Sequence, residues 1–222
     1  MAALHKVAQS GSTDAMVALA RALPQVEDAN DWADCPESLT LGPVLRTLPK
    51  EAGATFLSAR QGSSRSSERR RYLIAAGLSG DATVQPALIA ALERPQERRA
   101  ALLALALNGR AGAIEAVCPF TRSRDRGTRR CALAAAAALG GDEGARILST
   151  ALRRTADRRT VMECVRSTNE RWVIPVFVDG LDYRDTRDDC LNGLRRLFDG
   201  RGPRSGNPVA WKAWLGLESE RP

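Results

Sequence analysis

A spacing of about thirty residues between turn-forming residues constrains this chain more than any other feature. A glycine or asparagine follows each of five apolar runs. The successive spacings between these turn-forming residues are 29, 32, 28 and 31 residues. The positions are Gly80, Gly109, Gly141, Asn169 and Gly200. Self-similarity with a period of about 20–50 residues indicates an architecture in which each repeat buries its apolar face against its neighbours. The sequence therefore predicts a stack of two-helix repeats.

The first helix of each predicted repeat opens with an acidic residue and arginines. Apolar residues then recur at helical spacing, as Leu102, Leu105 and Ala106 do, so they share one helix face. Glycine, asparagine or aspartate after the run favours a left-handed cap. The predicted first helices cover residues 67–78, 96–107, 125–139, 157–165 and 185–198.

A second, less regular helix follows each turn. Three of the four clear segments contain a proline or a small-residue break, which should bend or shorten the helix. The predicted second helices cover residues 82–92, 111–120, 143–152 and 170–181.

Five consecutive alanines, Ala134 to Ala138, lie inside the predicted first helix 125–139. Alanine supplies no large side chain for a core, but it lets another helix approach to the short end of the usual ~8–10 Å interaxial range. We therefore expect a close-packing surface there rather than a flexible tract.

These features together resemble a known family. Two helices per repeat, an acid-plus-arginine entry, "A..AL" followed by glycine, and then "P.L..AL" resemble the short HEAT repeats of armadillo-like proteins, especially bacterial phycobilisome-lyase HEAT-like proteins. The resemblance covers about residues 66–200. It implies an all-α fold, a right-handed α-solenoid of about five to six two-helix repeats. Residues 1–65 are then expected to form an N-terminal helical cap, with a possible diverged first repeat, and residues 201–222 a tryptophan-containing C-terminal cap.

Composition narrows the classes of function. The chain has 222 residues, 44% hydrophobic and 27% charged, and lacks a long uninterrupted apolar stretch, which favours a cytoplasmic protein without membrane contact. Its five cysteines form no CxxC pair, and its single histidine is His5, so we expect neither metal nor other cofactor. No nucleophile–base pair stands out, so we expect no enzyme and no small-molecule substrate.

Arginines concentrate in the five predicted connections between repeats. The windows 60–71, 94–99, 122–130, 153–159 and 184–187 hold nineteen arginines and five acids, although the whole chain carries a net charge of only +7. Because connections between stacked repeats emerge on one edge, a basic ridge is predicted there. Its candidate partner-binding residues are Arg65, Arg69, Arg70, Arg94, Arg98, Arg122, Arg124, Arg126, Arg129, Arg154 and Arg158.

Part of this charge has a structural explanation. In HEAT-like repeats an acid and an arginine of each repeat commonly form a ladder of ion pairs that holds the stack in register. The candidate rungs are Glu97, Arg99, Asp125, Arg130, Asp157 and Arg159. The remaining arginines are either a functional ridge or a solvated face.

Two tryptophans mark the C-terminal segment. Trp211 and Trp214 are three residues apart and share a helix face. Paired large aromatics at this spacing are usually core, so we expect a hydrophobic lid on the last repeat rather than an aromatic ligand site.

Three functions remain open at this point. An interaction scaffold or adaptor would meet a protein partner with an acidic surface through the solenoid groove and the basic ridge. A nucleic-acid-binding protein would contact phosphates through the same arginines, although aromatic residues for base stacking are scarce. Catalysis, as in chromophore lyases or HEAT-like DNA glycosylases, is suggested only by the resemblance. The scaffold is the favoured interpretation.

Overall fold

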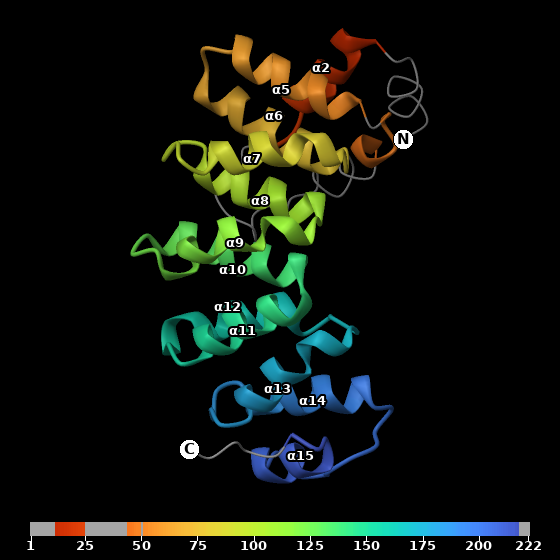
Figure 1. The fold of residues 1–222 in the computed structure, drawn as a ribbon, viewed down its shortest axis with the longest axis vertical. Coiled ribbons are helices and arrows are strands. Elements are labelled where there is room, and N and C mark those ends of the chain that lie inside the picture. The colour runs from red at the N-terminus through yellow and green to blue at the C-terminus, as the bar shows by residue number, and fades with distance from the viewer. Residues whose placement is uncertain (1–11, 25–43, 50, 218–222) are drawn as a thin grey trace. The chain divides into compact units, whose positions relative to one another are not determined.

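The chain is built from helices. The computed structural model describes residues 12–24, 44–49 and 51–217, and these contain no strand (Figure 1). No helix in these ranges is both long and apolar enough to cross a membrane. Contacts divide the chain into unit 1 (Met1–Leu139) and unit 2 (Gly140–Pro222), and each is described by itself. The prediction of an all-α protein is confirmed, whereas the sequence-based division at residues 65 and 200 stays a prediction.

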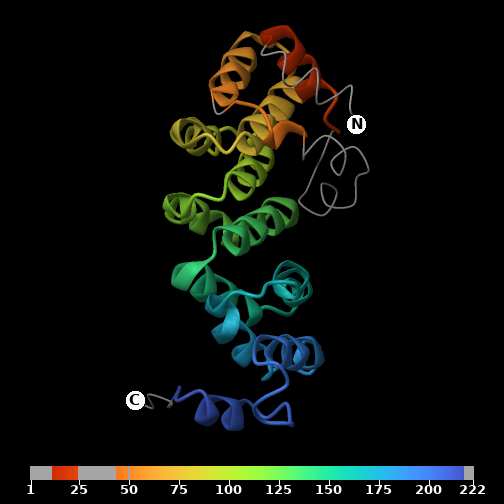
Figure 2. The same ribbon diagram turned by 90° about the vertical axis from the view of Figure 1, so that its right-hand side faces the viewer.

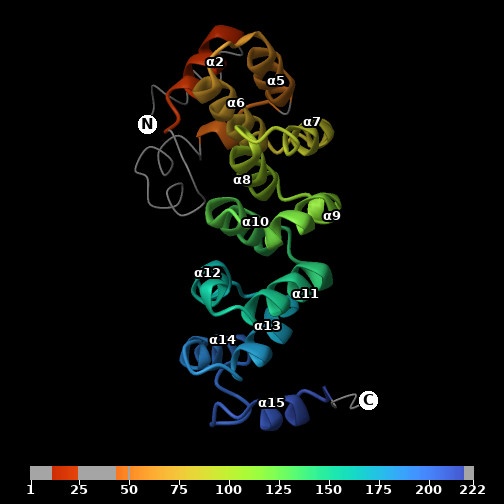
Figure 3. The ribbon, with the colours of Figure 1, turned by 90° about the vertical axis from the view of Figure 1, so that its left-hand side faces the viewer.

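Three of the predicted first helices lie in unit 1. They are α6 (Ser66–Leu78), α8 (Arg98–Asn108) and α10 (Arg126–Leu139). α6 packs against α8 and α8 against α10, so the three follow one another side by side (Figure 3). α5 (Ala52–Gly62) and α2 (Thr13–Arg21) pack against α6 and against each other.

The second helices of unit 1 are short and interrupted, as their prolines predict. Residues 82–91 form the 3₁₀ turn η1 (Ala82–Val84) and α7 (Gln85–Ala91), with Pro86 at the helix start. The next second helix contains only the four-residue α9 (Ile114–Val117). It lies between η2 (Ala111–Ala113) and η3 (Cys118–Arg122), where Pro119 interrupts the pattern. A proline nitrogen has no hydrogen to donate, so these segments cannot continue as regular helix.

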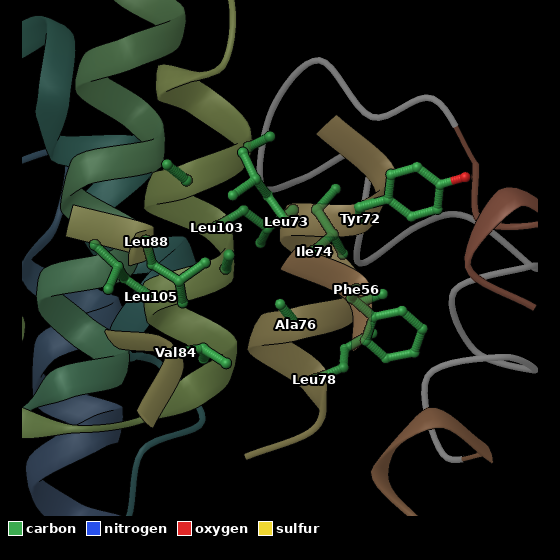
Figure 4. Packing of buried hydrophobic residues seen from close by; sticks show 14 of the residues in the cluster. Phe56, Tyr72, Leu73, Ile74, Ala76, Leu78, Val84, Leu88, Leu103 and Leu105 are labelled. Atoms are coloured by element: carbon green, nitrogen blue, oxygen red, sulfur yellow. The ribbon is translucent and has the colours of Figure 1, made fainter. Parts of the chain in front are cut away.

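The apolar faces of these helices form one core in unit 1 (Figure 4). Its fully buried side chains include an aromatic pair from α5 and α6 and aliphatic residues from η1, α7 and α8. Those labelled in the figure are Phe56, Tyr72, Leu73, Ile74, Ala76, Leu78, Val84, Leu88, Leu103 and Leu105. Burial of such side chains supplies the main driving force for packing the helices together.

Small residues set the distance between the first helices. A methyl group added at Gly77 of α6 would lie 2.3 Å from the carbonyl oxygen of Ala104 in α8, so the two backbones touch. In α10, which packs on α8, Ala132 and Ala135 are fully buried in the core of unit 1. The prediction of a close-packing surface is therefore confirmed for the buried face of α10, whereas Ala138 at the end of the alanine run is exposed.

Unit 2 pairs α11 (Gly141–Leu152) with α12 (Thr155–Val165), and α13 (Ile174–Gly180) with α14 (Arg187–Leu197). α13 follows the 3₁₀ turn η4 (Arg171–Val173) and also contacts α11 and α15 (Pro208–Trp214). Figure 2 shows this part of the chain from teal to blue. Only α11 among the four predicted second helices lacks proline, and at 12 residues it is the longest of them.

The predicted turn residues differ in how they reverse the chain. Gly80, Gly109, Gly141 and Gly200 have positive φ angles, and Gly109 is the left-handed C-cap of α8. Asn169 does not: among the described residues other than glycine, only Asp199 has a positive φ. Asn169 instead accepts a hydrogen bond at Oδ1 from Arg196 Nε, at 2.9 Å. Its side chain, rather than a left-handed backbone, holds this turn.

Replacing Gly77 by alanine should lower the free energy of unfolding by about 1 kcal/mol. Overpacking against the Ala104 backbone costs about 1–3 kcal/mol. The better helix propensity of alanine returns about 1 kcal/mol. Urea denaturation followed by circular dichroism measures the difference. The control is Gly62→Ala at the end of α5, where nothing lies within 4 Å of the added methyl group; equal stability of the two variants would contradict the close approach.

Candidate partner-binding surface

One arginine in the first four residues of each first helix closes the end of the preceding helix. Its guanidinium donates to the backbone carbonyl six residues earlier, at or next to the C-cap of that helix. These clamp arginines and their acceptors are Arg69 to Ser63 (3.2 Å), Arg98 to Leu92 (2.8 Å), Arg129 to Ser123 (2.7 Å), Arg158 to Leu152 (2.8 Å) and Arg187 to Leu181 (3.1 Å). The last carbonyls of a helix have no partner within the helix, so the clamp satisfies a group that would otherwise depend on water.

Two clamp arginines also stack on aromatic rings. The Arg158 guanidinium lies 3.9 Å from the ring centre of Tyr183, and Arg98 lies 5.0 Å from that of Phe120. A cation over a ring face is attracted by the ring quadrupole. Four of the five clamp arginines belong to the predicted ridge. Arg187 was not singled out, although its spacing of 29 residues from Arg158 is a visible signal.

Arginines of one first helix also form ion pairs with acids that precede the next first helix. Arg69 Nε lies 2.8 Å from a Glu97 oxygen, and Arg99 contacts Asp125 through two nitrogens at 3.0 and 3.3 Å. In unit 2, Arg158 lies 3.1 Å from Asp185. These three contacts have the geometry expected of rungs.

The remaining rung candidates occupy other positions. The sequence predicts Arg159 as a rung, but Arg158 fills that role, and Arg159 pairs with Glu163 one turn along its own helix. Arg159 is 91% exposed and Arg158 only 17%, because one residue turns a helix by about 100°. Asp157 is buried and lies 2.7 Å from Arg154 Nε. Arg130 is half-buried on α10, and its role as a rung stays a prediction.

Glu97 is the most deeply buried acid of the connections, with a side chain 2% exposed. Arg60 Nε donates to it at 2.9 Å and Arg69 from the other side, so both carboxylate oxygens are satisfied. Arg94 reaches it only at 3.8 Å and stays 61% exposed. A hollow of about 530 Å³ is lined by these four residues. Arg60, which the ridge prediction omitted, is a buried structural partner.

Asp125 also caps α10. Its carboxylate accepts from the Thr128 backbone N–H at 2.9 Å, an arrangement typical of a helix N-terminus. The hydrogen bonds from Thr128, together with the nearby Arg99 guanidinium, lower the pKa of the Asp125 carboxyl to about 2. Asp125 therefore both caps the N-terminus of α10 and pairs with Arg99 as the acid of a rung.

The other ridge arginines divide by exposure and pairing. Arg122, Arg124 and Arg126 are exposed and make no ion pair or hydrogen bond through their side chains among the described residues. Arg65 is 79% exposed and lies 3.5 Å from Glu68. Arg70 is half-buried and already has an interaction partner. The connection 122–126 therefore carries the largest group of unengaged cations predicted for the ridge.

In unit 2, Arg153 and Arg184 are exposed and likewise unpaired within the described ranges. Neither was chosen from the sequence, which does not distinguish an unengaged arginine from a clamp arginine a few residues away. Of the predicted ridge residues there, Arg154 pairs with Asp157 and Arg158 is a clamp.

The two C-terminal tryptophans have different environments. Trp211 is fully buried, and its indole N–H donates to the Ser205 carbonyl at 3.1 Å. Trp214 is 46% exposed. Both rings lie within 6.2 Å of the Phe198 ring, centre to centre. Trp211 is therefore the buried member of this aromatic cluster and Trp214 is only partly covered, while their role as a lid stays a prediction.

Replacing Asp125 by alanine should destabilise the protein at pH 7 by about 1 kcal/mol, as loss of a helix cap does. Asp125→Ser keeps an uncharged acceptor and should recover most of this loss. Because the folded pKa lies below the ordinary value near 3.9, the charge stabilises the fold fully above about pH 5 and progressively less as the pH falls towards 2. Urea denaturation of the three proteins across this range measures the effect; a serine-to-wild-type difference that does not change with pH would contradict it.

Replacing Arg158 by lysine should lower the free energy of unfolding by about 1–2 kcal/mol. A single ammonium cannot donate to Leu152, pair with Asp185 and lie flat on Tyr183 at once. The matched control is Arg159→Lys at the exposed neighbouring position, which should change stability by less than about 0.5 kcal/mol. Thermal and urea denaturation compare the two. If both substitutions have the same effect, Arg158 is not a clamp.

Comparisons with known proteins do not assign this chain to a family. The chain matches no family model and no curated protein sequence. The HEAT-like resemblance therefore rests on the quoted residues alone.

Proposed function

We propose that this chain is a right-handed α-solenoid of about five to six HEAT-like repeats that acts as a non-catalytic protein–protein interaction scaffold or adaptor. Its exposed basic connections bind an acidic surface of a protein partner. The observation that carries the proposal is the group formed by Arg122, Arg124 and Arg126, three exposed cations in one connection without a partner in the described structure.

The packing within unit 1 supports the repeat architecture. α6, α8 and α10 succeed one another side by side, and each carries a clamp arginine in its first four residues. Clamp positions recur at intervals of 29 to 31 residues, the same period as the turns. A period shared by turns, clamps and packed helices is what a quasi-one-dimensional array requires.

A protein partner fits the surroundings of the three arginines better than a single-stranded nucleic acid. Base stacking needs an open aromatic face, but the nearest aromatic residue in sequence, Phe120, is half-buried beneath Arg98. The only large exposed aromatic residue in the described ranges is Trp214, in the other unit. Carboxylates of a partner need only the guanidinium donors that these arginines supply.

The buried cysteines support a role without catalysis. Burial raises the pKa of the Cys190 thiol to about 12, so it carries no thiolate at neutral pH. Cys131 is also buried, while Cys118 and Cys164 are half-buried on helices. His5 and Cys35 lie outside the described residues.

Substituting glutamine for Arg122, Arg124 and Arg126 together should weaken partner binding by about tenfold or more, since rim charges mainly set electrostatic attraction. The partner is identified by crosslinking and co-purification, and its affinity is measured by titration at low and physiological salt. Labelled duplex and single-stranded DNA and RNA are titrated in parallel. The proposal expects protein binding to persist at physiological salt and nucleic-acid binding to be lost.

The control carries the same change of charge elsewhere. Arg166, Arg171 and Arg201 are exposed and unpaired in the described part of unit 2, and their triple glutamine variant should bind within about twofold of wild type. Equal losses of affinity for the partner in both triple variants would show that the effect depends only on net charge. Tight binding of nucleic acid at physiological salt, lost only in the Arg122, Arg124, Arg126 variant, would contradict the scaffold proposal. The function supported would then be nucleic-acid binding.

A further inference from the structure

Unit 2 contains a charged groove whose lining includes no residue of the connection 122–126. It runs between α11 and α13, which pack against each other, and has a volume of about 570 Å³. This volume is within the range of about 300–1,000 Å³ typical of ligand sites. Its walls come from one face of α11, from α13 with the residues that follow it, and from α15.

The α11 wall is a polar stripe. Asp142, Arg146, Ser149 and Arg153 follow one another at intervals of four, three and four residues, so they share one helix face. Ala145 on the same wall keeps the groove open because its side chain is small. The buried Ser149 hydroxyl oxygen has no hydrogen-bond partner among the described residues. That hydroxyl group can donate and accept a hydrogen bond, so it is available to a ligand that enters the groove.

Charges of both signs line the groove without pairing. Asp142, Asp179 and Asp182 form no ion pair within the described ranges, and neither do Arg153 and Lys212. Other charges nearby are engaged: Arg146 contacts Glu143, which lowers the pKa of that carboxyl, and Arg158 stacks on Tyr183. Five unpaired charges on three elements therefore face one space.

We propose that this groove binds a peptide segment of a partner protein that carries both basic and acidic side chains. The basic side chains pair with Asp179 and Asp182, and an acidic one pairs with Arg153 or Lys212. A polyanion such as nucleic acid is disfavoured, because three carboxylates would oppose its phosphates. This proposal rests on the scaffold function only in requiring a protein partner; its surface and its preferred charges differ from those of the connection 122–126.

The probe is a random twelve-residue peptide library displayed on phage and selected on the immobilised full-length chain at physiological salt. Enriched peptides should combine lysine or arginine with aspartate or glutamate. The same selection is run on the Asp179→Asn, Asp182→Asn double variant, whose side chains keep their size. There the enrichment of basic residues should disappear. Circular dichroism and thermal denaturation verify that the variant is folded.

A synthetic, fluorescein-labelled copy of the most enriched peptide then gives the affinity by anisotropy. Asp179→Asn with Asp182→Asn should weaken it at least tenfold, whereas the Arg122, Arg124, Arg126 triple glutamine variant should leave it unchanged. If the connection variant loses the partner and keeps the peptide, both proposals stand. If it keeps the partner, the scaffold proposal fails by itself. Absence of mixed-charge enrichment, or identical selection on both proteins, overturns the groove proposal.

Discussion

The hydrogen bond from an arginine to the carbonyl six residues earlier is the contact on which each connection depends. α7, α9 and α13 have seven, four and seven residues, so most of their backbone groups lie within one turn of a helix end. Such short helices gain little from their own hydrogen bonds and leave several carbonyls without a partner. A guanidinium can satisfy a carbonyl with one edge and still reach an acid or a ring with another. In three of the five clamps, those of Arg69, Arg98 and Arg158, one side chain thus joins three segments.

This use of arginine separates two populations within what looks, in the sequence, like one basic surface. Clamp and rung arginines are oriented by carbonyls, carboxylates and rings, so their charge is largely committed to the fold. Arg122, Arg124 and Arg126 lie within seven residues of the clamp Arg129 but contact none of these groups in the described structure. Electrostatic attraction to a partner is therefore expected from positions that the packing does not use, rather than from the basic windows as a whole.

The sequence predicted the helices well because their signals are periodic. Turns at intervals of about thirty residues and apolar positions at helical spacing survive small errors of register. The prolines also predicted which second helices would be short. Roles of individual arginines were harder to assign. Arg158 and Arg159 are adjacent and identical in type, but one is a clamp and rung and the other points to solvent. A shift of one residue, which leaves periodicity intact, exchanges their roles. Asn169 shows the same limit: the turn was predicted, and its side-chain mechanism was not.

The charges of the groove in unit 2 are paired less completely than the acids of the connections. In the connections, each acid forms an ion pair with an arginine, and Glu97, which pairs on both sides, is deeply buried. In the groove, three aspartates, an arginine and a lysine line one hollow, and none of them forms an ion pair in the described structure. These charges are distributed over the α11 wall, over α13 with the residues that follow it, and over α15. A ligand that bridges them needs no rearrangement of the fold, and its affinity would reflect charges already positioned by α11, α13 and α15.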